Sequence, residues 1–154
     1  MKKLLLIAYI LLIPCLLCAK TKITPQQYSM VMNIAKENDV PLSVARQLMK
    51  EESVGYVDAV SPVTSAGYIS AGLFQLYMCP DNIDYLLTKF WKYDKHYFDV
   101  NNPEHNAVVA MKYLNWLHKW YGSWYKALIY YNHGSIYDAS EQTKAYARRI
   151  INAR

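Results

Sequence analysis

The sequence is poor in the residues that build disulfide frameworks and phosphate-binding loops, with only three cysteines and five glycines among 154 residues. Cys15 and Cys18 lie in an apolar N-terminal stretch, so Cys79 alone remains beyond it and no intrachain disulfide framework can form there. The four histidines follow no metal-ligand spacing. No glycine-rich phosphate loop, nucleophilic serine or cysteine motif or concentrated basic stripe is present. We therefore expect no metal, no cofactor and no nucleic-acid partner.

The N-terminal segment has the pattern of an export signal. Two lysines precede an apolar run over residues 4–17, which is too short to span a membrane comfortably. This pattern predicts a signal peptide over residues 1–19 and export to the periplasm or cell envelope. Two alternatives remain open, because Leu17 is larger than signal peptidases prefer near a cut. They are an uncleaved membrane anchor through this segment and a lipoprotein signal with lipid on Cys18.

The remainder, residues 20–154, has the composition of one globular domain. It contains no repeat, low-complexity tract or linker rich in proline and glycine, and the hydrophobic fraction of the chain is 53%. The formal charge of +5 suits an anionic polymer as a binding partner.

Helical patterns dominate this domain. Apolar periodicity and capping residues predict helices near residues 25–38, 41–53, 83–93, 102–122, 123–134 and 140–151. In the last of these, Tyr146, Ile150 and Ile151 are expected on one side. Residues 54–75 carry scattered glycines and a proline, which predicts a long functional loop with at most a little strand. The fold class is therefore mainly α.

One carboxylate is predicted to lie on the inward, apolar face of a helix, where charged residues are uncommon. The inward face of the second helix carries Val44, Ala45, Leu48 and Met49. At 100° per residue, Glu52 lies within roughly 10° of the centre of this face, whereas Glu51 lies about 90° away. A buried carboxyl has a raised pKa and can donate a proton near neutral pH. Periodicity leaves open the alternative that the helix ends before Glu52, whose side chain would then point into solvent.

Short motifs surround this carboxylate and continue to the end of the chain. They are Glu52-Ser53, Ala59-Val60-Ser61, Gly72-Leu73-Phe74-Gln75-Leu76, Asn102-Pro103-Glu104-His105-Asn106, Tyr113-Leu114, Tyr131-Asn132-His133-Gly134 and Thr143-x-x-Tyr146. In this order and spacing, over about residues 25–151, they resemble the catalytic domain of soluble lytic transglycosylases. That family shares its fold with goose-type lysozyme. The resemblance implies a lysozyme-like helical domain with a long active-site loop and at most a small β element.

The resemblance also implies a reaction and a substrate, the glycan strands of peptidoglycan. Glu52 would protonate the β-1,4 glycosidic oxygen between N-acetylmuramic acid and N-acetylglucosamine. Its carboxylate would then deprotonate the muramoyl C6 hydroxyl, which attacks C1 and closes a 1,6-anhydro ring. Ser53, Gln75, Tyr131 and Tyr146 match motif positions that bind or support the sugar, and Tyr131 is expected to hydrogen-bond near the Glu52 carboxyl. Structural roles remain open for Ser53, Tyr131 and Tyr146.

The chain departs from the family pattern in ways that bear on substrate fit. The segment between Ser61 and Gly72 is longer than usual, and Val54 stands where the family has glycine. Trp116, Trp120 and Trp124 sit at helical spacing and are expected to pack in the core or at its rim rather than to bind sugar.

Two other functions stay open. One is a muramidase of the same fold, in which a second carboxylate such as Asp58 positions a water molecule. The other is a weakly catalytic glycan-binding component of a wall-spanning secretion or conjugation apparatus.

Overall fold

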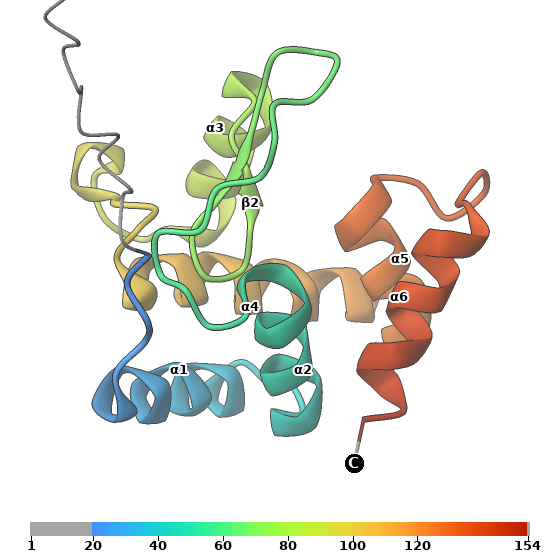
Figure 1. Ribbon diagram of the computed structural model, residues 1–154, viewed down its shortest axis with the longest axis horizontal. Helices are drawn as coiled ribbons and strands as arrows, with labels where there is room; N and C mark the ends of the chain where they lie inside the picture. The colour runs from blue at the N-terminus through green and yellow to red at the C-terminus, as the bar shows by residue number, and fades with distance from the viewer. Residues whose placement is uncertain (1–19, 154) are drawn as a thin grey trace, which may run out of the picture.

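The computed structural model describes residues 20–153, so the predicted signal peptide and its two alternatives lie outside the described residues. The elements are α1 (Pro25–Glu37), α2 (Leu42–Ser53), β1 (Ser70–Ala71), β2 (Leu76–Tyr77), α3 (Pro80–Phe90), a 3-10 turn η1 (Lys95–Tyr97), α4 (Pro103–Tyr121), α5 (Trp124–His133) and α6 (Glu141–Ile151). This mainly helical architecture confirms the predicted fold class (Figure 1). None of the helices between residues 20 and 153 is long and apolar enough to cross a membrane.

The helix boundaries follow the capping residues. Thr24 and Gln27 form the predicted capping box at α1, and the Asn102 side chain accepts from two backbone N–H groups at the start of α4. Gly122 and Gly134 end α4 and α5 in the left-handed region. One expectation was wrong. Helix α3 begins and ends three residues earlier than predicted, because a proline opens it at residue 80.

Helix α4 is the centre of the packing. It contacts α1, α3 and α5, while α6 packs against α5 and α2, as the ribbon view shows (Figure 1). The fully buried side chains at these contacts include Leu48, Met111, Leu114, Leu117, Leu128 and Ile150. Each such side chain contributes about 1.5–3 kcal/mol relative to an exposed one. Because α2 and α6 are joined through this core, residues far apart in the sequence meet at the end of α2.

The predicted long loop and small strand element are both present. Strands β1 and β2 pair antiparallel, with Ser70 opposite Tyr77 and Ala71 opposite Leu76. The preceding segment, residues 60–69, projects from the body of the molecule above the end of α2 (Figure 1). It is anchored at its base by a bridge between Val60 and Ala71.

The turn between the two strands is fastened to α4 by one buried amide. The Asn106 Oδ1 accepts from the Phe74 N–H at 2.8 Å, and its Nδ2 donates to the carbonyls of Val100 and Ala71 at 3.0 and 3.3 Å. Gly72 has a φ of +80°, and a Cβ there would lie 2.2 Å from Asn106 Nδ2. Glycine is therefore required at position 72, because the Asn106 side chain lies against the backbone there.

The residue that ends α2 is under backbone strain. Val54 has a φ of +56°, a left-handed conformation that costs a β-branched residue about 1–2 kcal/mol. Its side chain is 60% exposed, so it contributes little packing. We expect Val54→Gly to raise the melting temperature by about 2–4 °C, even after the greater entropy of glycine in the unfolded chain.

The control for this substitution is Val63→Gly, at another exposed valine whose φ is not positive. Calorimetry of the two variants should show opposite shifts, because only Val54 releases strain. A lower melting temperature for Val54→Gly would contradict the inference that Val54 is strained at the end of α2.

Candidate active site

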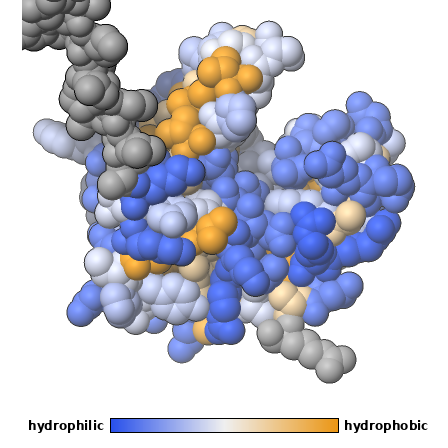
Figure 2. Space-filling model, viewed as in Figure 1, coloured by the Kyte–Doolittle hydropathy of each residue, from blue (hydrophilic) through white to orange (hydrophobic). Residues whose placement is uncertain are grey.

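A cleft of about 480 Å³ opens where the end of α2 meets the strand turn and the end of α5. Its lining residues are Glu52, Thr64, Ser70, Gln75, Leu76, Tyr77, Asn82, Leu86, Tyr113 and residues 130–134. The space-filling view shows the surface hollowed between the projecting loop and the lobe formed by α5 and α6 (Figure 2). The predicted acid Glu52 lies in this hollow.

The two neighbouring glutamates of α2 have different surroundings. Glu51 forms an ion pair with Arg149 of α6 at 2.9 Å, which lowers the pKa of its carboxyl. Glu52 lines the cleft instead. Helix α2 continues through Ser53, so the alternative in which the helix ends before Glu52 is wrong. The choice of Glu52 over Glu51 as the inward carboxylate is confirmed.

Burial sets the protonation of Glu52. Burial is the largest influence on the Glu52 carboxyl and raises its pKa to about 7. The negative charge of Glu51 also raises this pKa, whereas a hydrogen bond to the carboxyl lowers it. The donor of that hydrogen bond is the Tyr146 hydroxyl, 94 residues further along the chain. At neutral pH the protonated and ionised forms of Glu52 are thus both populated, as general acid and base catalysis requires.

The hydrogen-bond partner of Glu52 is Tyr146 rather than the expected Tyr131. Tyr146, on α6, donates to Glu52, and burial raises the pKa of its hydroxyl, so it stays a neutral donor. Tyr131, on α5, donates to the Phe74 carbonyl at 2.8 Å rather than to the Glu52 carboxyl. Burial, and then the nearby Glu52 charge, raise the pKa of Tyr131 as well. Both rings thus stand beside the acid, but Tyr146 is its hydrogen-bond partner.

Gln75 and Ser53 bind backbone. Gln75 lines the cleft with a φ of +50°, and its amide donates at 2.9 Å to the carbonyls of Ala59 and Gly72. It thereby ties the chain that follows α2 to the strand turn, at the cost of a strained backbone. Ser53 is buried, donates to the Met49 carbonyl and accepts from the Gly55 N–H. It is not among the lining residues, and its position is that of a helix-end hydroxyl.

Several lining residues were not singled out from the sequence as site residues. Tyr113 and Tyr130 add aromatic surface from α4 and α5, and Asn82 from α3 and Thr64 from the loop add polar groups. Tyr113 belongs to one of the recognised motifs and Tyr130 adjoins Tyr131, so motif position was the available indication for both. Asn82 and Thr64 lie on segments that contain no such motif.

Glu52 is the only carboxylate among the lining residues of this cleft, within the described part of the chain. Asp58, the candidate second carboxylate of a muramidase, accepts from the Thr21 backbone N–H at 2.9 and 3.1 Å and does not line the cleft. Among residues 20–153, no group of three potential ligand side chains that could hold a metal ion was found. The site therefore offers one acid, aromatic walls and backbone-anchored amides.

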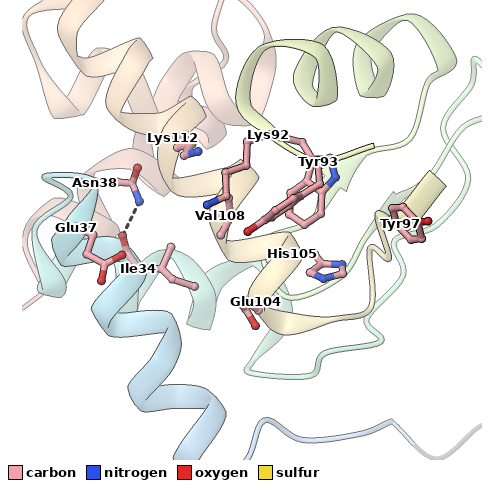
Figure 3. Close-up of a pocket in the computed structure, with 11 residues that line it drawn as sticks. Ile34, Glu37, Asn38, Lys92, Tyr93, Tyr97, Glu104, His105, Val108 and Lys112 are labelled. Atoms are coloured by element: carbon pink, nitrogen blue, oxygen red, sulfur yellow. Dashed lines mark hydrogen bonds between the residues drawn. The ribbon is translucent and has the colours of Figure 1, made fainter. Parts of the chain in front are cut away.

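A second hollow of about 440 Å³ lies between the end of α1, residues 91–97 and the first half of α4 (Figure 3). Its acidic residues, Glu37 and Glu104, are exposed, and its lysines give it mixed charge. Neither carboxyl is withdrawn from solvent as the Glu52 carboxyl is. The Glu52 cleft is therefore the candidate active site.

Comparison with protein families gives one match. Residues 29–153 match the family model described as the transglycosylase SLT domain, from within α1 to beyond the end of α6. Comparisons with curated proteins and with solved structures gave no match. The matched region covers most of the chain and includes every residue of the Glu52 site. The chain therefore belongs to the transglycosylase SLT domain family, which indicates a function of the lytic transglycosylase type directed at peptidoglycan.

Proposed function

We propose that this protein is an exported lytic transglycosylase that cleaves the β-1,4 bond between N-acetylmuramic acid and N-acetylglucosamine and forms 1,6-anhydro-N-acetylmuramic acid. The observation that carries the proposal is the solitary, buried carboxyl of Glu52, with a pKa of about 7, in a cleft lined by no other acid among the described residues. A hydrolase of the usual kind needs two carboxylates, one of which positions or replaces water. An internal nucleophile removes that need.

The reaction uses Glu52 twice. The protonated carboxyl donates to the glycosidic oxygen as the bond from C1 to that oxygen breaks. The resulting carboxylate then accepts the proton of the muramoyl C6 hydroxyl, whose oxygen bonds to C1. The proton count balances and no water is consumed. Because the attacking hydroxyl belongs to the same sugar, the second step is intramolecular and gains the corresponding entropic advantage.

Product mass distinguishes this reaction from hydrolysis. We expect purified sacculi digested by the wild-type protein to release muropeptides with anhydro ends, lighter by one water than reducing ends. Digestion in ¹⁸O-labelled water should leave the products unlabelled. Products that carry only reducing ends, labelled with ¹⁸O, would overturn the proposal in favour of a muramidase.

Tyr146 should tune the pH range of the reaction. Its hydrogen bond lowers the pKa of Glu52, so Tyr146→Phe should raise that pKa further. Activity requires the protonated acid and therefore falls as pH rises above the pKa of Glu52. The alkaline limb of the rate of sacculus clearing, measured from pH 5 to 9, should move to higher pH in Tyr146→Phe. Tyr131→Phe, which removes a bond to backbone, serves as the control, and an equal shift in both variants would contradict this role.

A further inference from the structure

One aromatic stripe on α4 continues out of the cleft. Tyr113 lines the cleft, and Trp116 and Trp120 follow it at helical spacing, all within about 60° of one another around the helix. Seven residues of helix separate Tyr113 from Trp120, which places their Cα atoms about 10 Å apart along the axis. The stripe therefore leads from the cleft wall along α4 towards its C-terminal end.

The rings of this stripe stack on one another. The ring centroids of Tyr113 and Trp116 are 6.2 Å apart with an interplanar angle of 16°, and those of Trp116 and Trp120 are 5.7 Å apart at 28°. On the other side, Tyr113 contacts Tyr131 beside the catalytic acid at 5.7 Å. An unbroken series of aromatic contacts thus joins the Glu52 site to Trp120.

The last ring of the series is the most exposed, whereas Tyr113 and Trp116 are half-buried. Trp116 is covered by the Lys89 ammonium, 3.6 Å from its ring centroid, and by Phe90 of α3. Trp120 is 71% exposed, so the expectation that it packs in the core or at its rim was wrong. The contact with Trp116 leaves most of the Trp120 ring exposed, and an exposed indole face can stack on the apolar face of a sugar ring.

Polar groups suited to sugar hydroxyls surround the same end of the cleft. Tyr130 lines the cleft, and its ring centroid lies 5.5 Å from that of Tyr121. The Lys89 ammonium donates to the Tyr85 hydroxyl at 2.8 Å beside the stripe. A few polar groups beside aromatic side chains can orient a bound ligand by hydrogen bonds.

We propose that Trp120 forms an outlying subsite that stacks on a sugar ring of the glycan strand as the strand leaves the cleft along α4. This subsite rests on the proposed function only in its choice of ligand, a β-1,4-linked N-acetylated amino sugar chain. It binds oligosaccharides long enough to reach from Glu52 to Trp120 and is not reached by a disaccharide bound at Glu52.

Binding is measured with the Glu52→Gln protein, so that the ligand is not cut. The probes are the hexamer and the dimer of β-1,4-linked N-acetylglucosamine, titrated by calorimetry. Trp120→Ala in this background should weaken hexamer binding roughly five- to tenfold, the range expected for one aromatic stacking contact, and leave dimer binding unchanged. Trp120→Tyr should restore most of the affinity. The control is Tyr97→Ala, which removes a ring that is 74% exposed beside the other hollow.

Equal hexamer affinity in the Trp120→Ala and Tyr97→Ala proteins would overturn the subsite and assign the exposed ring to another kind of partner. An equal loss for hexamer and dimer would also overturn it, because the effect would then lie at the cleft itself. Failure of the proposed reaction appears separately, as reducing-end products from the wild-type protein, and leaves this binding result intact.

Discussion

Replacement of Glu52 by glutamine should reduce the rate of sacculus cleavage by about 10³-fold or more. The amide keeps the size and the acceptor oxygen that Tyr146 contacts, but it neither donates a proton to the glycosidic oxygen nor removes one from C6. General acid and base catalysis each contribute about 10²–10⁴-fold, and this residue is assigned both steps. Release of soluble muropeptides, quantified by chromatography, measures the effect. A rate within tenfold of wild type would remove Glu52 from the mechanism.

The same variant should be more stable than wild type at neutral pH. The Glu52 pKa is about 7 in the folded protein and 4.5 without these surroundings, so the folded state holds its proton where the unfolded state has lost it. The stability of the wild type therefore falls as pH rises from about 4.5 to about 7 and is constant above that range with respect to this group. Since each pH unit corresponds to about 1.4 kcal/mol, the advantage of Glu52→Gln should reach about 3 kcal/mol above pH 7 and vanish below pH 4.5.

Glu51→Gln is the matched control for both measurements, one residue away on the same helix. It breaks a partly exposed ion pair with Arg149, which contributes at most about 1 kcal/mol. It also removes a charge that raises the pKa of Glu52, so its alkaline limb should move to slightly lower pH with little loss of rate. A loss of activity in Glu51→Gln as large as that in Glu52→Gln would show that the α2 end, rather than one carboxyl, is required.

Asn106→Ala should destabilise the domain by about 3–5 kcal/mol. It leaves the Phe74 N–H and the carbonyls of Ala71 and Val100 without their partner in the interior. Since domains are stable by about 5–15 kcal/mol, much of the margin is removed. Urea unfolding monitored by circular dichroism measures the change.

Asn102→Ala, at the cap of the same helix, provides the comparison for Asn106→Ala. Its side chain accepts two N–H bonds at the surface, so its loss should cost only about 1 kcal/mol. Equal effects of the two substitutions would contradict the inference that the buried hydrogen bonds of Asn106 stabilise the domain more than a helix cap does. The Asn106 variant should also lose activity below its melting temperature. Asn106 holds the Phe74 backbone by its N–H, and the Phe74 carbonyl in turn accepts the hydrogen bond that positions Tyr131 in the cleft wall.

Much of this fold is predictable from local sequence because its helices have explicit boundaries. Thr24 with Gln27, Asn102, Gly122 and Gly134 each stand at a helix end where the structure has them. The inward position of Glu52 is also a local property, since helix phase alone separates it from Glu51. These features depend on residues within a few turns of one another.

The contacts across the site are not local and were harder to predict. The partner of Glu52 is Tyr146, and which of the two motif tyrosines reaches the carboxyl depends on how α6 packs against α2. The exposure of Trp120 likewise depends on where α3 stops, because Lys89 and Phe90 cover Trp116 but not the ring one turn later. Periodicity gives the side of a helix but not the neighbour that meets it.

The most direct test of the Glu52 assignment is the titration of its own carboxyl. Carbon-13 NMR of protein labelled at the glutamate side-chain carboxyl carbon, with the Glu52 resonance assigned by its loss in Glu52→Gln, follows this group from pH 3 to 9. The buried environment predicts a midpoint of about 7, with Glu51 titrating below its ordinary value. A Glu52 midpoint near 4.5 would show a solvated carboxylate, which has no proton to give at neutral pH, and would contradict the mechanism proposed for this site.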